Sequence, residues 1–234
     1  MPSICVNCGG MPTIKAHIVP AGIGRLIRGK GSGNLKITQG KAEPTQLGIF
    51  DKNILCEACD NYIGKHDDYA IRHIRNFREK CTRKPGKQFI HPSIDCKKFS
   101  MFLLSVVWRA SKSQRPALKH FSLGEFEKEI GDVIFGRKAI DYLDNVNIFV
   151  CLYKLRFPAL KLLYSLPNSG IDDGALIVGF TMPGMGIRIY IGDHSDLKFT
   201  NNIAINRSSI MRGLYREFEN TADGQELLRL FRGD

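Results

Sequence analysis

Four cysteines arranged as two Cys-x-x-Cys pairs limit what this chain can fold into more than any other feature of the sequence. The first pair is Cys5 and Cys8, and the second is Cys56 and Cys59. A Cys-x-x-Cys turn presents two thiolates from one tight bend, and two such turns supply the four tetrahedral ligands that zinc prefers. We therefore expect a structural Zn²⁺ that ties together a loop of roughly fifty residues. The alternative is a redox pair or ordinary buried thiols, and the adjacent Gly9-Gly10 disfavours it because glycines let the backbone turn toward a metal.

The other cysteines and the absence of long apolar runs indicate the cellular compartment. Cys81, Cys96 and Cys151 are scattered singly, a pattern typical of a reducing compartment and not of a disulfide framework. No apolar run reaches the ~18–20 residues that a membrane helix needs. The first residues show no charged region followed by an apolar one, so no secretory signal is visible. These features predict a cytoplasmic protein without a membrane partner.

The charge of the chain points to a polyanionic partner. The 234 residues carry 34 Lys and Arg against 23 Asp and Glu, a formal net charge of +11. The hydrophobic content of 43% is ordinary for a globular protein and allows a proper core. Nucleic acid is a better match for such a charge than a membrane surface.

Hydrophobic periodicity predicts a zinc-containing module in residues 1–82, followed by a domain in 83–234. In the module we expect strands at 12–19 and 48–55, a glycine-rich loop or loose hairpin at 21–46, and a helix from Glu57. The apolar stripe of that helix consists of Ile63, Ala70, Ile74 and Phe77. Proline and glycine residues near 84–92 mark the boundary.

In residues 83–234 the pattern changes from helices to strands. Residues 99–110 are apolar on nearly every side and predict a buried helix, and capping-box spacing at Ser122–Glu125 predicts a second helix that ends near Gly136. Strands are expected at 146–154, 159–165, 175–181 and 186–191, and amphipathic helices at 208–218 and 225–231. Helices followed by a run of strands favour an α+β fold with a mainly antiparallel sheet.

Three stretches of the module together resemble a known family. They are Cys5-Val-Asn-Cys8, His17-Ile-Val-Pro20, and the run from Asp51 to Asp60 that contains the second cysteine pair. This combination is similar to the zinc-bearing HNH (ββα-metal, treble-clef) endonucleases, in particular to the bacterial branch with a "His-Ile-Ile-Pro" signature. The resemblance covers roughly residues 3–80. It implies a zinc-stapled treble-clef ββα module that hydrolyses phosphodiester bonds in DNA.

The resemblance also implies roles for four residues. His17 falls on the position of the general base, and Asp51 falls where the family has an orienting Asn. Asn53 is the residue of the usual type, displaced by two. Asp60 falls on the position of a cation ligand, and Asp67 lies two helical turns further on the same face. Carboxylate oxygens suit Mg²⁺ or Mn²⁺, so we expect one of these as the catalytic cation.

One departure from the family keeps a second interpretation open. Many HNH enzymes carry a cation ligand directly before the base, and here that residue is Ala16. The alternative is therefore a non-catalytic, zinc-containing protein that binds nucleic acid. A third interpretation, compatible with the first, is an antiviral defence effector whose C-terminal domain senses a ligand or partner and gates the nuclease. Association with a second copy or a partner protein through that domain stays open.

Basic residues near the module are candidates for contacts to the nucleic-acid backbone. One group lies in the glycine-rich segment, which has no acidic residue between Pro20 and Lys41, and the other recurs at every third position of the predicted helix. The candidates are Arg25, Arg28, Lys30, Lys36, Arg72, Arg75 and Arg78. DNA is the expected ligand and RNA is not excluded. Either group could instead be a solvated surface.

Overall fold

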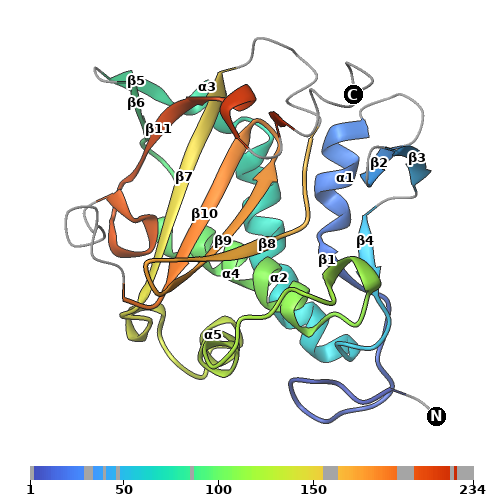
Figure 1. Cartoon of the computed structure of the whole chain (residues 1–234). Helices are drawn as coiled ribbons and strands as arrows, with labels where there is room; N and C mark the ends of the chain where they lie inside the picture. The colour runs from blue at the N-terminus through green and yellow to red at the C-terminus, as the bar shows by residue number, and fades with distance from the viewer. Residues whose placement is uncertain are drawn as a thin grey trace.

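The computed structural model describes residues 3–28, 34–38, 41–45, 48–84, 87–154, 163–193, 203–221 and 224–225. Its N-terminal part consists of a two-stranded sheet and a long helix (Figure 1). β1 (Ala16–Val19) pairs antiparallel with β4 (Ile49–Asp51), and α2 (Glu57–Ile74) follows β4. The predicted strands are therefore present but shorter than expected, and the helix begins at the predicted residue.

The segment between β1 and β4 agrees only in part with the prediction of a loop or loose hairpin. It forms a helix, α1 (Ala21–Arg28), and a hairpin of β2 (Asn34–Thr38) and β3 (Lys41–Thr45). The prediction of a loop was wrong for 21–28. The glycines there suggested a loop, but Ile23, Leu26 and Ile27 have helical spacing and contact the core, so burial of that face outweighs the low helix propensity of glycine.

Three α-helices follow α2 in the described part of the chain, and the second of them is long and buried at the centre of the molecule. After α3 (Phe77–Lys80), α4 (Cys96–Lys112) begins at Asp95, whose side chain accepts a hydrogen bond from Lys98 N at 3.0 Å. α4 is buried on most sides, as predicted. α5 (Phe126–Ile134) is also present, but Glu125 at its N-terminus makes no capping bond, so the capping-box prediction was wrong in detail.

A seven-stranded sheet packs against α4. Its strand order is β5-β6-β11-β7-β10-β9-β8, and every pair is antiparallel except β11 with β7. The mainly antiparallel sheet was predicted correctly. The strands are β5 (Thr82–Lys84), β6 (Gln88–His91), β7 (Val146–Lys154), β8 (Asn168–Asp172), β9 (Ala175–Met182), β10 (Met185–Ile191) and β11 (Met211–Glu217).

β11 corrects the helix predicted at 208–218. Gly213 explains the difference, because a Cβ there would lie 2.1 Å from the carbonyl oxygen of Val150 and 2.6 Å from the Phe89 ring. This close approach lets β11 enter the sheet between β6 and β7, and it could not be read from the amphipathic spacing. The expected strand at 159–165 and the helix at 225–231 lie mostly outside the described residues, and Leu163–Ser165 form no strand.

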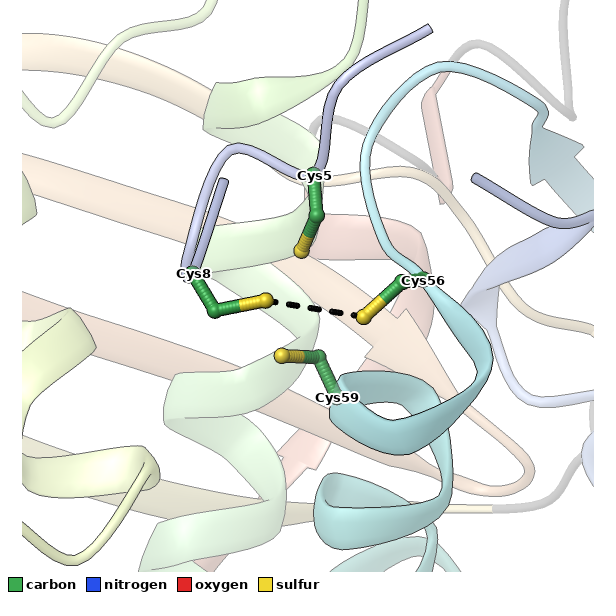
Figure 2. A group of neighbouring side chains, drawn as sticks. All are labelled: Cys5, Cys8, Cys56 and Cys59. Carbon is green, nitrogen blue, oxygen red and sulfur yellow. Dashed lines mark hydrogen bonds between the residues drawn. The ribbon is translucent and has the colours of Figure 1, made fainter. Parts of the chain in front are cut away.

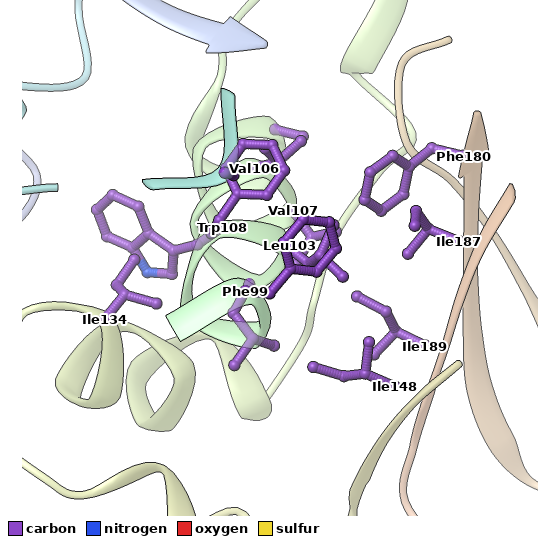
Figure 3. Close-up of a cluster of buried hydrophobic side chains, with 14 of the residues drawn as sticks. Phe99, Leu103, Val106, Val107, Trp108, Ile134, Ile148, Phe180, Ile187 and Ile189 are labelled. Carbon is purple, nitrogen blue, oxygen red and sulfur yellow. The ribbon is translucent and has the colours of Figure 1, made fainter. Parts of the chain in front are cut away.

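Short 3₁₀ turns complete the described structure. They are η1 (Pro116–Leu118), η2 (Ile140–Tyr142), η6 (Ile205–Arg207) and η7 (Phe218–Asn220). One hydrophobic core cluster joins both sides of the predicted boundary, from Cys5 and Ile18 to Met211. Figure 3 shows Leu103 and Val107 of α4 facing Ile148, Ile187 and Ile189 of the sheet. The division into residues 1–82 and 83–234 stays a prediction.

Candidate functional site

The two cysteine pairs form one cluster, as the sequence predicts. The four Sγ atoms of Cys5, Cys8, Cys56 and Cys59 all lie within 4.8 Å of one another, and they point toward a common centre (Figure 2). Ligands about 2.3 Å from a tetrahedral zinc are roughly 3.8 Å apart, and the Sγ atoms of Cys8 and Cys56 are 3.6 Å apart. This thiol cluster could hold a metal ion such as zinc.

The surroundings of the thiol cluster stabilise sulfur ligands. Asn7 Nδ2 lies 3.1 Å from Cys59 Sγ, and Gly10 N lies 3.4 Å from Cys8 Sγ, so both sulfurs accept hydrogen bonds. Burial raises the pKa of Cys59 to about 12. Burial opposes ionisation of Cys5 as well, but backbone amides outweigh it and lower the pKa of Cys5 to about 7. Four thiolates this close together would repel one another without a cation between them.

His17 lies on the outward side of β1 in a group of aromatic and basic side chains. It pairs with Phe50 of β4, and the two rings meet edge to face with centroids 6.2 Å apart. Lys15 Nζ lies 3.8 Å from the centroid of the Phe50 ring, and the Arg115 guanidinium carbon lies 5.8 Å from it. Arg115 also donates a 2.8 Å hydrogen bond to the Phe50 carbonyl. We call these four residues the His17 surface.

Asp51 does not orient His17. It is paired with Ala16, so its side chain points to the opposite face of the two-stranded sheet from His17. Its carboxylate accepts hydrogen bonds from Asn53 N at 2.9 Å, Ser113 Oγ at 2.8 Å and Gln114 N at 2.9 Å. Asp51 therefore anchors β4 to the end of α4. Asn53 is also held elsewhere, because its Oδ1 accepts from Ser3 Oγ at 2.7 Å.

Asp67 is bound to an arginine that sequence reasoning missed. Arg109 of α4 is 1% exposed, and its Nη1 and Nη2 donate to the two carboxylate oxygens of Asp67 at 2.9 and 2.8 Å. Its remaining N–H groups bind the carbonyl of His17 at 2.8 Å and the carbonyl and hydroxyl of Ser105 at 3.1 Å each. All five donors of Arg109 are thus used. The Asp67 carboxylate is paired with the Arg109 guanidinium through both of its oxygens.

Asp60 is the third carboxylate that the sequence predicts at the site. It is half-buried, and burial raises its pKa, while the charge of Arg109 lowers it and that of Asp67 raises it. The charges of both Arg109 and Asp67 therefore act on Asp60. Within the part of the chain that the structure describes, however, the thiol cluster is the one group of three or more potential metal ligands that lie together. Ala16 is fully buried and contributes no ligand.

The predicted backbone-binding residues divide into three groups. Arg25, Arg72 and Arg75 are exposed. Arg78 is not part of an exposed face: it donates hydrogen bonds to the carbonyls of Tyr153 and Gly184, the latter at 3.1 Å, and connects α3 to the sheet. Lys30 and the side chains of Arg28 and Lys36 lie outside the described residues.

In comparisons with known proteins, no protein-family model, curated protein or solved structure matches the chain. The resemblance to HNH nucleases therefore stays a prediction. Among the described residues, no helix is both long enough and apolar enough to cross a membrane. The sequence could have indicated Lys15 and Phe50, because they lie close to His17 and Asp51 along the chain. Nothing in it indicated Arg109, which is 92 residues after His17, or Arg115, which is 65 residues after Phe50.

Proposed function

We propose that this protein binds nucleic acid through the His17 surface, on a module stapled by zinc at the thiol cluster. The observation that supports this most directly is the placement of Lys15 and Arg115 over one aromatic ring beside His17. Neither cation forms an ion pair with another described residue, so both can bind a phosphate. The net charge of +11 would draw a polyanion toward this surface.

The test compares variants that lose one or two charges. Lys15→Gln, and Lys15→Gln combined with Arg115→Gln, should weaken binding to duplex DNA and reduce the slope of log K against log salt by about 0.9 for each lost phosphate contact. Lys128→Gln is the matched control, because Lys128 is 87% exposed on α5, away from His17. Binding is measured by fluorescence anisotropy at several salt concentrations. Unchanged affinity and slope in both variants would reject the proposal.

Phosphodiester hydrolysis of the HNH type is the second candidate. One observation in its favour is that His17 is partly exposed within the same surface. Another is that Asp60 is partly exposed, whereas Asp67 is buried and accepts two hydrogen bonds from Arg109. In this scheme His17 accepts a proton from water while Asp60 helps to hold Mg²⁺ or Mn²⁺ at the scissile phosphate. Asp51 and Asp67 have structural roles instead.

Cleavage of plasmid DNA with Mg²⁺ or Mn²⁺ tests this candidate. His17→Ala and Asp60→Ala should each keep the fold and reduce cleavage by at least ~10²-fold, the usual scale for loss of a general base. Asp68→Ala is the matched control, since Asp68 is an exposed carboxylate on the same helix. If wild-type protein binds DNA and cleaves no duplex or single-stranded substrate, binding alone is the function.

A further inference from the structure

The seven-stranded sheet has two different faces. The side chains of Ile148, Ile187 and Ile189 point toward α4 (Figure 3). Because side chains alternate along a strand, Phe149 and Arg188 point to the other side. In Figure 1, α4 and α2 lie behind β7 and β10, and the opposite face is turned toward the viewer without a described helix over its centre. We call this the outer face.

Basic residues are concentrated on the outer face. Arg188 of β10 pairs with Phe149, so both side chains lie on this face. On β11, Arg216 pairs with Tyr153 and Leu214 pairs with Cys151, two β7 residues of the same face. Arg212 is two positions before Leu214 and therefore lies on that face as well. The three arginines are exposed, and none forms an ion pair with another described residue. Arg216 and Arg188 both lower the pKa of Cys151, which burial raises, so both charges act on the same part of the face.

The outer face has little negative charge to neutralise these arginines. Strand register places one carboxylate among its described strand positions, Asp172, which pairs with Ala175 at the end of the edge strand β8. At the other edge of the sheet, Lys84 of β5 adds a further exposed cation. It lies on the outer face because it pairs with Gln88, and Gln88 pairs with Leu214 of that face. Cations spread over a surface that is nearly free of carboxylates attract a polyanion.

Two aromatic rings lie among the arginines. Phe149 and Tyr190 are diagonal neighbours on β7 and β10, with ring centroids 5.6 Å apart and planes at 85°. Phe149 and Tyr190 are both partly exposed. Phe218 and Leu163 cover Tyr153 at the far end of β7, so the accessible part of the outer face is centred on Phe149 and Arg188.

We propose that the outer face of the seven-stranded sheet binds single-stranded nucleic acid, with Arg188 and Arg212 on phosphates and Phe149 and Tyr190 as stacking platforms for bases. Unpaired bases can stack on aromatic side chains of an open sheet, whereas the bases of a duplex are already stacked on one another. Exposed arginines beside the rings hold the charged backbone. This inference goes beyond the proposed function because it concerns a different surface and an unpaired form of the ligand.

The test measures the affinity of a fluorescent single-stranded DNA and RNA probe of about 12 nucleotides, within the range of known site sizes, by anisotropy. Arg188→Gln combined with Arg212→Gln should weaken binding and reduce the salt slope by about 0.7 per lost contact. Phe149→Leu and Tyr190→Leu, which keep apolar side chains but remove the rings, should each weaken binding by about tenfold, within the range measured for base stacking. Circular dichroism confirms that each variant is folded.

Two comparisons separate this inference from the proposed function. Arg188→Gln with Arg212→Gln should weaken binding of the single strand more than binding of the duplex, whereas Lys15→Gln with Arg115→Gln should do the reverse and Lys128→Gln should change neither. A base-free polyphosphate should compete more weakly than the oligonucleotide at equal charge. If the folded outer-face variants bind the single strand like wild type, or if polyphosphate competes equally well, the inference is wrong, whatever the Lys15 and Arg115 variants do to duplex binding.

Discussion

Arg109 and His91 are both buried polar side chains, but their surroundings differ. Arg109 has a hydrogen-bond acceptor for each of its donors. His91 of β6 is 0% exposed, and neither of its ring nitrogens has a hydrogen-bond partner among the described residues. Its ring packs against Phe77 at 4.7 Å between centroids and lies near His73 at 6.3 Å. Such a site accommodates a neutral imidazole and opposes a charged one.

His91 should therefore make the protein sensitive to acid. Burial, with smaller effects of His73 and Lys80, lowers the pKa of His91 from 6.5 to about 4. Since the folded state prefers the neutral ring, this stabilisation is complete above pH 6.5 and is lost as the pH falls toward 4. The loss amounts to roughly 3 kcal/mol from this residue. Denaturant unfolding at several pH values between 7 and 4 measures it.

Variants identify the residue responsible. His91→Phe and His91→Leu remove the titration and should flatten the decline in this pH range, although the lowered pKa values of His66 and His73 leave a smaller decline of the same sign. His120→Ala, at an exposed position, is the control. A decline of the same size in wild type and in both His91 variants would show that His91 has the same pKa in the folded and unfolded states, and would contradict this prediction.

At the scale of elements, the thiol cluster connects the N-terminal segment to the start of α2. Residues 3–10 contain one turn, at 6–8, and no helix or strand, and the second cysteine pair is at the start of α2. Backbone hydrogen bonds such as Val6 N to Ile54 O, at 3.0 Å, join the segments. A short segment without regular structure loses much entropy on ordering, so metal binding would supply much of the free energy that holds it in place.

We expect near-stoichiometric zinc in the purified protein and a requirement for it in the N-terminal part. Elemental analysis measures the zinc, and hydrogen exchange measures protection at Cys5–Gly10 and at the start of α2. Cys56→Ser should lose both the metal and this protection. Cys81→Ser is the control, because Cys81 lies apart from the thiol cluster. Full protection after removal of all metal would contradict a structural role.

At the scale of the whole molecule, the Arg109–Asp67 pair joins α4 to α2 and, through the His17 carbonyl, to β1. Both side chains are buried, and the larger hydrophobic core cluster of the described residues extends from the thiol cluster to the seven-stranded sheet. Because both partners are buried, removal of one leaves an unpaired charge in the core. The N-terminal part and the sheet should then lose stability together.

Arg109→Met should destabilise the protein by roughly 3–5 kcal/mol, the usual cost of breaking a buried ion pair from one side. Combining it with Asp67→Leu should recover most of that loss, because an apolar pair leaves no charge uncompensated. Denaturant unfolding followed by Trp108 fluorescence and by far-UV circular dichroism measures both variants. A single variant as stable as wild type, or a double variant no better than the single one, would contradict this role.

Local sequence was sufficient for the features whose causes are local. Cysteine spacing identified the thiol cluster, and hydrophobic periodicity identified α2, α4, β7, β9 and β10, because burial of one face follows directly from residue order. The α+β class and the mainly antiparallel sheet followed from the order of these elements. The placement of His17 on a short strand before Pro20 was also readable.

Tertiary structure alone decided the surroundings of those residues. Asp51 and Asp67 have the spacing of catalytic residues, but Ser113 and Arg109, which are far away in sequence, occupy their carboxylates. The amphipathic pattern of 208–218 suits a helix, but Gly213 admits the backbone of β7, and the segment pairs as a strand. Residue order determines which face of an element is apolar, whereas the partners of a polar side chain depend on elements that folding brings together.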